Sequence, residues 1–211
     1  MISLSVYNIE GKEVDKIKVD ETLLGGEVRY PLLKQAIVMY HANKRVGTAA
    51  TKSRGMVAGS TRKLYKQKGT GNARVGNLRT AKRVGGGVTF AKKARDFSRG
   101  MPKKQRRLAC DSAVLAKLLN QNIVVVDELK IEAPKTKEFA GILVNLKIDR
   151  SCLVTLKEFD DNVYRSARNL PRVAVMPVAL LNAGDVCNHS KVLFTREAFM
   201  SYINKEQTVE N

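Results

Sequence analysis

The sequence has no tryptophan, and aromatic residues make up only 6% of its 211 residues. Its three cysteines, Cys110, Cys152 and Cys187, are widely separated and form no Cys-x-x-Cys pair, which argues against a disulfide framework and a zinc site. It has no run of eighteen apolar residues that could span a membrane. The first residues match neither a secretory signal nor a transit peptide. These absences favour a cytoplasmic protein with buried, reduced cysteines and no membrane partner.

Candidate catalytic residues are also few. His41 and His189 have no cysteine or carboxylate at a catalytic spacing, and Asp160–Asp161 are expected to begin a helix, where the helix dipole favours acids. Gly71 and Gly76 have the G-x-x-x-x-G spacing of a phosphate-binding loop, but the Lys and Ser/Thr that complete this motif are missing. We therefore expect no enzyme, no cofactor and no metal site.

Acidic residues are nearly absent from one part of the chain. Between Lys44 and Arg107 there are twenty Lys or Arg, ten of the fifteen glycines and a single acid, Asp96. The remaining residues are together almost neutral, although the whole chain has a formal net charge of +18. The sequence therefore predicts a single globular domain over residues 1–43 and 103–211, interrupted by an extended basic, glycine-rich loop over residues 44–102.

Outside this loop, the apolar pattern predicts regular structure. Alternation over residues 2–19 indicates a β-hairpin around Glu10–Gly11. Apolar residues recur at helical intervals in five segments, which predicts five helices. These segments are the residues after Pro31, residues 103–120, 137–146 and 161–170, and the residues after Thr195, a candidate N-cap. The short apolar runs "IVVV", "CLVTL", "VAVM" and "VLF" lie between these helices. This alternation predicts an α/β three-layer sandwich with a mostly parallel, Rossmann-like sheet of four strands, preceded by the hairpin.

The basic loop follows neither a helical nor a strand period. Its isolated hydrophobic residues cannot bury enough area to offset an ordering entropy of about 1 to 2 kcal/mol per residue, so a functional binding element is expected. Lys and Arg neutralise a polyanion, glycine permits close approach, and Tyr65 or Phe90 could stack on an unpaired base. These properties favour RNA binding over a solvated linker, or over a membrane-surface helix, which would need a continuous apolar face.

Four stretches carry a family resemblance: "KRVGTAATKSRGMVAGSTRKLYKQKGTGNARVG", "RVGGGVTFAKKARDFSRGMPKK", "VVVDELKIEAPKTKEFA" and "DDNVYRSARNLPRVAV". In these motifs and their order, the chain resembles the bacterial form of large-subunit ribosomal protein number four, the uL4 family. It departs from the family pattern at Leu64 and Tyr65, where proline and then tryptophan or phenylalanine are common, and at Asn72, where arginine is common.

The resemblance implies a structural constituent of the large ribosomal subunit that binds large-subunit rRNA, contacts other large-subunit proteins and takes part in subunit assembly. It also implies that the loop reaches the wall of the peptide exit tunnel, where its tip would meet the nascent peptide. The tip would comprise Arg62, Lys63, Leu64, Tyr65, Lys66, Gln67, Lys68, Gly69, Thr70 and Gly71. The residues expected to bind rRNA are Lys44, Arg45, Lys52, Arg54, Arg62, Lys63, Lys66, Lys68, Arg74, Arg79, Lys82, Arg83, Lys92, Lys93 and Arg95.

Two other hypotheses stay open at this point. The same basic loop could serve a regulator that binds mRNA or DNA, and some members of the family also repress their own operon. Alternatively, the α/β domain could carry a nucleotide site and be an enzyme.

Overall fold

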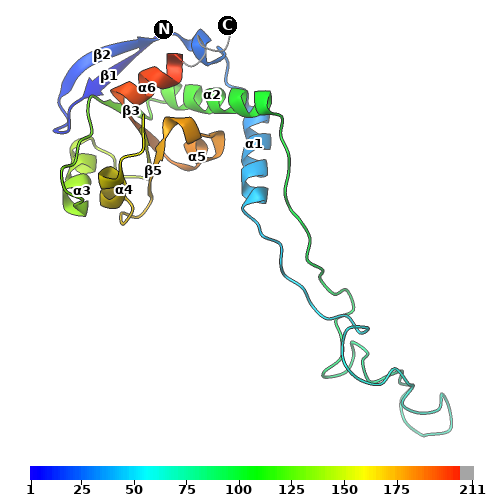
Figure 1. Cartoon of the computed structure of the whole chain (residues 1–211). Helices are drawn as coiled ribbons and strands as arrows, with labels where there is room; N and C mark the ends of the chain where they lie inside the picture. Colours follow the sequence, from blue (N-terminus) through cyan, green and yellow to red (C-terminus); the bar gives the residue numbers. More distant parts are fainter. Residues whose placement is uncertain (205–211) are drawn as a thin grey trace. The chain divides into compact units, whose positions relative to one another are not determined.

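The computed structural model describes residues 1–204, and the chain divides into two compact units. One unit combines Met1–His41 with the chain from Gly100 onward, and the other is Ala42–Arg99 (Figure 1). Helices and strands belong to the first unit, apart from the last residues of helix α1 (Tyr30–Asn43). In the second unit the only strand-like pairs among the described residues are two isolated bridges.

The first unit contains one sheet with the strand order β2-β1-β3-β6-β4-β5. Strand β2 is antiparallel to β1, and every other neighbouring pair is parallel. The strands are β1 (Ile2–Tyr7), β2 (Glu13–Val19), β3 (Ile123–Val126), β4 (Cys152–Leu156), β5 (Val173–Pro177) and β6 (Lys191–Thr195). The prediction of a mostly parallel α/β sheet is therefore confirmed.

The predicted strand number of four is wrong, because the N-terminal hairpin belongs to the same sheet. Val6 and Tyr7 of β1 pair in parallel with Val125 and Val126 of β3, so the sheet has six strands. The hairpin pattern shows that β1 and β2 pair with each other but carries no sign of a partner more than a hundred residues away. That pairing depends on the tertiary fold.

The predicted helices are present, and the structure adds one. The helices after α1 are α2 (Lys103–Leu119), α3 (Thr136–Asn145), α4 (Asp161–Ala167), α5 (Ala183–Asn188) and α6 (Arg196–Ile203), with 3₁₀ turns at Glu21–Leu24 and Val178–Leu180. Asp160 and Thr195 cap α4 and α6, since their side chains accept hydrogen bonds from the backbone N–H of Asn162 and Ala198. The added helix, α5, has only six residues, too few to show a helical period.

Two apolar cores lie on opposite faces of the sheet. Along β6, Val192 and Phe194 belong to one core and Leu193 to the other, as the alternation of side chains along a strand requires. Helices α1, α2, α5 and α6 contribute to the first core, whereas α3 and α4 contribute to the second. Because both faces are covered, the central strands β3, β4 and β6 are mostly apolar.

The three cysteines form no disulfide among the described residues. Cys110 and Cys152 are buried and Cys187 is half-buried. Burial raises the pKa of Cys152 to about 12, so its thiol is protonated at neutral pH and is not a nucleophile. Cys152 therefore fills space in the core.

Truncation of the central strand tests this architecture. Leu193 in β6 is 1% exposed, so Leu193→Ala should lower the free energy of unfolding by about 2 to 5 kcal/mol through lost burial and a residual cavity. Leu180→Ala is the matched control, because Leu180 is 67% exposed and its truncation should change stability little. Urea unfolding followed by circular dichroism measures both; equal effects would contradict the placement of β6.

Candidate nucleic-acid interface

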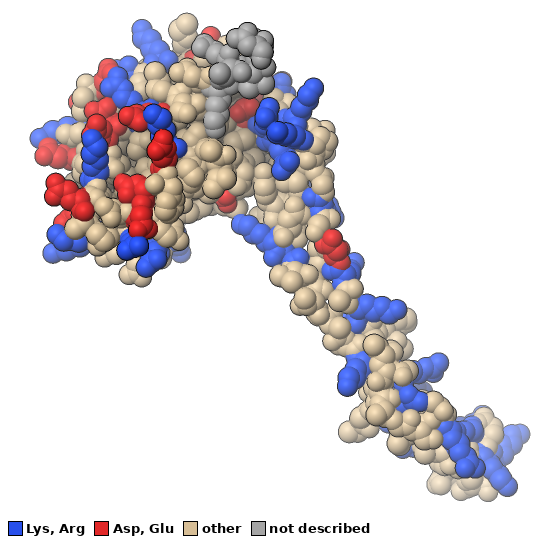
Figure 2. All heavy atoms as spheres, viewed as in Figure 1, with Lys and Arg blue, Asp and Glu red and all other residues tan. Residues whose placement is uncertain are grey.

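The Ala42–Arg99 unit carries a large excess of positive charge. It contains sixteen Lys or Arg and one acid, Asp96, whereas the rest of the chain contains 22 Lys or Arg and 19 acids. Figure 2 shows the same contrast: charged side chains of both signs occur on the α/β unit, while nearly all charged side chains seen on the other unit are Lys or Arg. Such a segment has the electrostatic properties of a polyanion-binding element.

These cations have no internal counter-charge. The ion pairs of the described residues all lie in the other unit, where for example Arg196 contacts Asp15 at 2.7 Å and Asp127 at 3.3 Å. The Asp96 carboxylate instead accepts hydrogen bonds from the backbone N–H of Ser98 at 2.8 Å and from its hydroxyl at 2.5 Å. An external anion is therefore needed to neutralise the unit.

The unit contains two limbs, residues 44–59 and 79–99, that lie side by side and run mostly in opposite directions, although the isolated bridge between Ser53 and Val88 is parallel. Backbone hydrogen bonds join Arg95 N–H to the Gly47 carbonyl at 3.2 Å and Thr51 N–H to the Lys92 carbonyl at 3.0 Å. Each bond joins residues more than 40 positions apart. The limbs are thus held together by their backbones, although they form no regular ladder.

One residue predicted to bind rRNA, Arg79, forms hydrogen bonds within the protein instead. The Arg79 guanidinium is half-buried and donates hydrogen bonds to the backbone carbonyls of Val57 at 2.9 Å and Gly55 at 3.3 Å. These bonds join the two limbs. Arg79 therefore has a structural role in the unit, which its position in a basic sequence does not reveal.

Two adjacent glycines permit close backbone packing next to Arg79: Gly87 faces the opposite limb, and Gly86 lies in a turn against Thr80 of its own limb. An added Cβ at Gly87 would lie 2.2 Å from the backbone nitrogen of Arg54 and 2.4 Å from the carbonyl carbon of Ser53. At Gly86 it would lie 2.0 Å from the carbonyl oxygen of Thr80. No side chain fits at either position, so these glycines are needed for packing.

The predicted tip residues form a turn that is closed across its base. Lys63 forms an isolated bridge with Asn77, and Leu64 N–H donates to the Gly76 carbonyl at 3.1 Å. Within the turn, the Tyr65 hydroxyl donates to the Ala73 carbonyl. The half-buried Tyr65 ring is thus held within the turn.

The far end of this turn is open. Gly69 and Gly71 have φ values of +84° and +69°, and an added Cβ would meet no atom within 4 Å at either. Lys66 and Lys68 are exposed beside them. Of the two rings predicted to stack on a base, Phe90 is the more accessible, with 93% of its surface exposed.

The structure leaves most predicted rRNA-binding cations accessible. Besides Lys63, whose ammonium donates to the Gln67 side chain, thirteen are exposed and form no ion pair with any described residue. They are Lys44, Arg45, Lys52, Arg54, Arg62, Lys66, Lys68, Arg74, Lys82, Arg83, Lys92, Lys93 and Arg95.

Site prediction from the sequence omitted some exposed cations. Arg99 belongs to the same unit, and Lys103, Lys104, Arg106 and Arg107 lie in the first two turns of α2, which has no acid in its first turn. The helix dipole disfavours cations at this end, so a bound anion would relieve their repulsion. The density of basic residues could have identified these positions.

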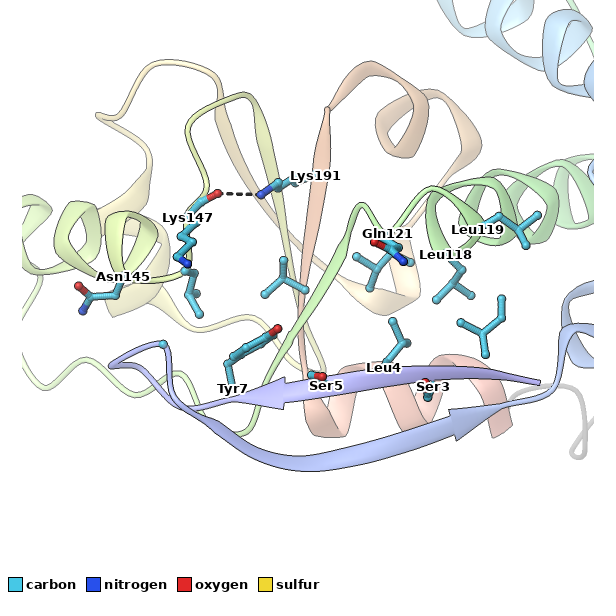
Figure 3. Close-up of a pocket in the computed structure, with 15 residues that line it drawn as sticks. Ser3, Leu4, Ser5, Tyr7, Leu118, Leu119, Gln121, Asn145, Lys147 and Lys191 are labelled. Atoms are coloured by element: carbon cyan, nitrogen blue, oxygen red, sulfur yellow. Dashed lines mark hydrogen bonds between the residues drawn. The ribbon is translucent and has the colours of Figure 1, made fainter.

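A separate hollow of about 580 Å³ lies in the α/β unit (Figure 3). It is lined by β1, the ends of α2 and α3, and the beginnings of β3 and β6, and the Lys191 ammonium donates to the Lys147 carbonyl at its rim. Its lining contains no His, Cys, Asp or Glu. Nucleotide sites of parallel α/β sheets lie at the carboxyl ends of the strands, whereas this hollow is at the amino ends of β3 and β6. It does not support the enzyme hypothesis.

The two histidines do not form a catalytic site either. His41 is exposed, and His189 is half-buried, with Nδ1 2.8 Å from the Asp185 carbonyl oxygen. Within residues 1–204, no cluster of His, Cys, Asp and Glu could hold a metal ion, and none of the helices has the length and apolarity to cross a membrane.

Comparison with known proteins gives one family. The model of the Ribosomal protein L4/L1 family matches residues 17–205. The chain is 45% identical over 198 residues to "Large ribosomal subunit protein uL4" of Pelotomaculum thermopropionicum, covering 94% of this chain and 96% of the relative. It is 44% and 41% identical, with the same coverage, to the proteins of that name from Symbiobacterium thermophilum and Alkaliphilus oremlandii.

Two glycine substitutions test the packing of the limbs. Gly87→Ala should loosen the Ala42–Arg99 unit, because the new methyl group would overlap the backbone of Arg54, and trypsin should then cleave this unit faster. Gly55→Ala is the control, since its Cβ would have a single neighbour, at 3.9 Å. The melting temperature of the α/β unit should be unchanged in both. Equal cleavage rates for the two variants would contradict the close packing at Gly87.

Proposed function

Because the chain belongs to the ribosomal protein L4/L1 family and is a structural constituent of the large ribosomal subunit rather than an enzyme, we propose that its Ala42–Arg99 unit binds large-subunit rRNA. The family also makes the chain a cytoplasmic component of that subunit, as in bacteria, with rRNA and other ribosomal proteins as its neighbours. The observation that carries the proposal is the set of sixteen cations without a single ion pair among the described residues. RNA phosphates supply the missing negative charge.

The binding energy comes mainly from charge neutralisation. Each Lys or Arg that contacts a phosphate releases condensed counterions. The magnitude of the negative slope of log K against log salt therefore increases by about 0.7 to 0.9 for each contact. Exposed cations occur along both limbs, from Lys44 to Arg74 on the first limb and the turn and from Lys82 to Arg99 on the second limb. The unit would therefore contact phosphates along its whole length. Close-packed glycines keep the paired limbs thin enough to pass between RNA segments.

We further propose that the turn over Arg62–Gly71 reaches the wall of the peptide exit tunnel and faces the nascent peptide. The motif "RKLYKQKGTG" supports this through its resemblance to the family. The open space around Gly69 and Gly71 suits a turn that ends at a surface. Proline is common in the family at the position of Leu64; here the hydroxyl of neighbouring Tyr65 is bonded across the turn and supplies rigidity by another route.

The same features suggest a role in subunit assembly. Among the described residues of the Ala42–Arg99 unit only Gly87 is buried, so little apolar area stabilises the paired limbs on their own. RNA binding would then stabilise their weak pairing further, and subunits would depend on this unit to reach their final structure. Backbone amides over residues 52–83 should exchange rapidly with deuterium in the free chain and slowly in assembled subunits. Equal protection in both states would contradict this role.

Deletion of residues 48–83 tests the rRNA-binding proposal. The shortened chain should bind large-subunit rRNA more weakly and with a smaller salt slope, because most exposed cations of the unit are lost. Its α/β unit should keep its melting temperature, since both cores lie outside the deletion. Competition with duplex DNA separates a general polyanion binder from an rRNA-binding protein. Undiminished rRNA affinity would show that this unit is not the main binding element.

Charge reversal at the turn tests the tunnel proposal. Lys63→Glu or Lys68→Glu should change the free energy of unfolding by no more than about 0.5 kcal/mol, because both residues are exposed. Assembly of the large subunit, or its sensitivity to tunnel-binding macrolides, should change instead. Crosslinking from position 68 should reach rRNA or the nascent peptide. A loss of stability as large as that of Leu193→Ala would place these residues away from an exposed turn.

A further inference from the structure

The ring of Phe97, on the second limb, is in contact with one arginine from each limb. The guanidinium carbon of Arg45, on the first limb, is 4.1 Å from the centroid of its ring, and that of Arg95, on the second limb, is 4.3 Å away. Both distances are within the range of a cation–π contact. One aromatic ring thus fixes the positions of two arginines that are 50 residues apart in the sequence.

The backbone packs around this ring and allows it little freedom. Gly47 has φ +75°, and an added Cβ would lie 2.8 Å from the Phe97 ring and 2.2 Å from the Arg95 carbonyl oxygen. The Arg95 N–H donates to the Gly47 carbonyl at 3.2 Å. On the other side of Phe97 in the chain, the Asn43 side chain accepts from the backbone N–H of Arg99 at 2.8 Å and donates to its carbonyl at 3.3 Å. The half-buried ring is therefore part of the joint between the limbs.

The charges at this joint are not balanced within the protein. Two guanidinium carbons on one ring are at most about 8 Å apart, so the groups repel each other. Asp96 lies between Arg95 and Phe97 in the sequence, yet its carboxylate is hydrogen-bonded to Ser98 and forms no ion pair with a described residue. Lys44 and Lys93 add further positive charge nearby in the sequence. Packing and backbone hydrogen bonds around the ring, rather than an acidic partner among the described residues, hold the two guanidinium groups together.

We infer that Phe97 is a positioning residue, which holds Arg45 and Arg95 as a paired-guanidinium site for phosphates of the RNA backbone. This inference rests on the proposed function, because it assigns a specific phosphate site to the same RNA-binding unit. A guanidinium that lies over an aromatic ring can keep its N–H edge available for bidentate bonds to phosphate oxygens. The many cations along both limbs favour a repeating polyanion over a single carboxylate as the partner.

Binding of the full chain to large-subunit rRNA, measured over a series of salt concentrations, tests the site. The double variant Arg45→Gln with Arg95→Gln should bind at least about fivefold more weakly and reduce the salt slope by about 1.4 to 1.8, as expected for two phosphate contacts. Phe97→Leu should weaken binding in the same direction, because both arginines lose the surface that orients them. Phe97→Tyr should restore it, since it keeps the ring.

Combining the substitutions separates positioning from a purely structural role. If Phe97 acts through the two arginines, Phe97→Leu should have no further effect in the double variant. If it lowers affinity there as much as in the parent protein, Phe97 only maintains the fold of the limbs and the inference is wrong. Phe90→Leu is the matched control: Phe90 is 93% exposed and has no cation–π contact with a described residue, so its loss should leave the salt slope unchanged.

The experiment also distinguishes failure of this site from failure of the proposed function. If the arginine pair proves dispensable while deletion of residues 48–83 still removes rRNA binding, the paired site is wrong and the proposed function stands. If the deletion has no effect either, both fail. If the double variant keeps its rRNA affinity but loses binding to polyglutamate, the pair recognises carboxylates, which would overturn the assignment to RNA.

Discussion

Uncompensated positive charge is the constraint on which the rest of this molecule depends. A stretch of 58 residues with sixteen cations and one acid repels itself, and the acid that it has is hydrogen-bonded to a neighbouring serine. Such a chain cannot fold around an apolar core, because its few hydrophobic side chains are scattered. The Ala42–Arg99 unit instead pairs its limbs through backbone hydrogen bonds, which are indifferent to side-chain charge. This arrangement leaves nearly all of its cationic groups free to meet phosphate.

The α/β unit, in contrast, is stabilised by apolar cores and has little excess charge. Its charges are nearly balanced, and its sheet is covered on both faces by helices, so hydrophobic burial stabilises it without RNA. Hydrophobic burial and excess charge are thus separated in the chain: residues that fill the cores are not those that carry the excess charge. A substitution at an exposed cation of the basic unit can therefore alter RNA binding while leaving the fold of the α/β unit intact.

Within the basic unit, a minority of side chains hold the limbs together. Arg79 bonds to backbone carbonyls of the opposite limb, the Tyr65 hydroxyl closes the tip, and Phe97 supports two arginines. Glycine occupies the positions where backbone segments approach most closely, because an added Cβ at Gly86 or Gly87 would overlap backbone atoms. These contacts give a chain without a core a defined course. They also make a basic residue such as Arg79 part of the scaffold rather than of the exposed cationic surface.

Local signals in the sequence were enough to predict much of this protein. Apolar periods located five of the six helices of residues 1–204, and Thr195 and Asp160 marked two helix starts. The charge and glycine pattern separated a basic segment from the rest of the sequence. Each of these features depends on residues close together in the chain. The sequence motifs also led to the correct family.

Only the tertiary structure decided the remaining features, because they depend on residues distant in sequence. The pairing of β1 with β3 turned four expected strands into six, and the six-residue helix α5 has no period of its own. In the basic unit, the sequence does not distinguish Arg79 from its exposed neighbours, since a hydrogen bond to Val57 exists only once the limbs are paired. Periodicity and charge report what a segment can bury or attract, whereas the partner that it finds is determined by the three-dimensional path of the chain.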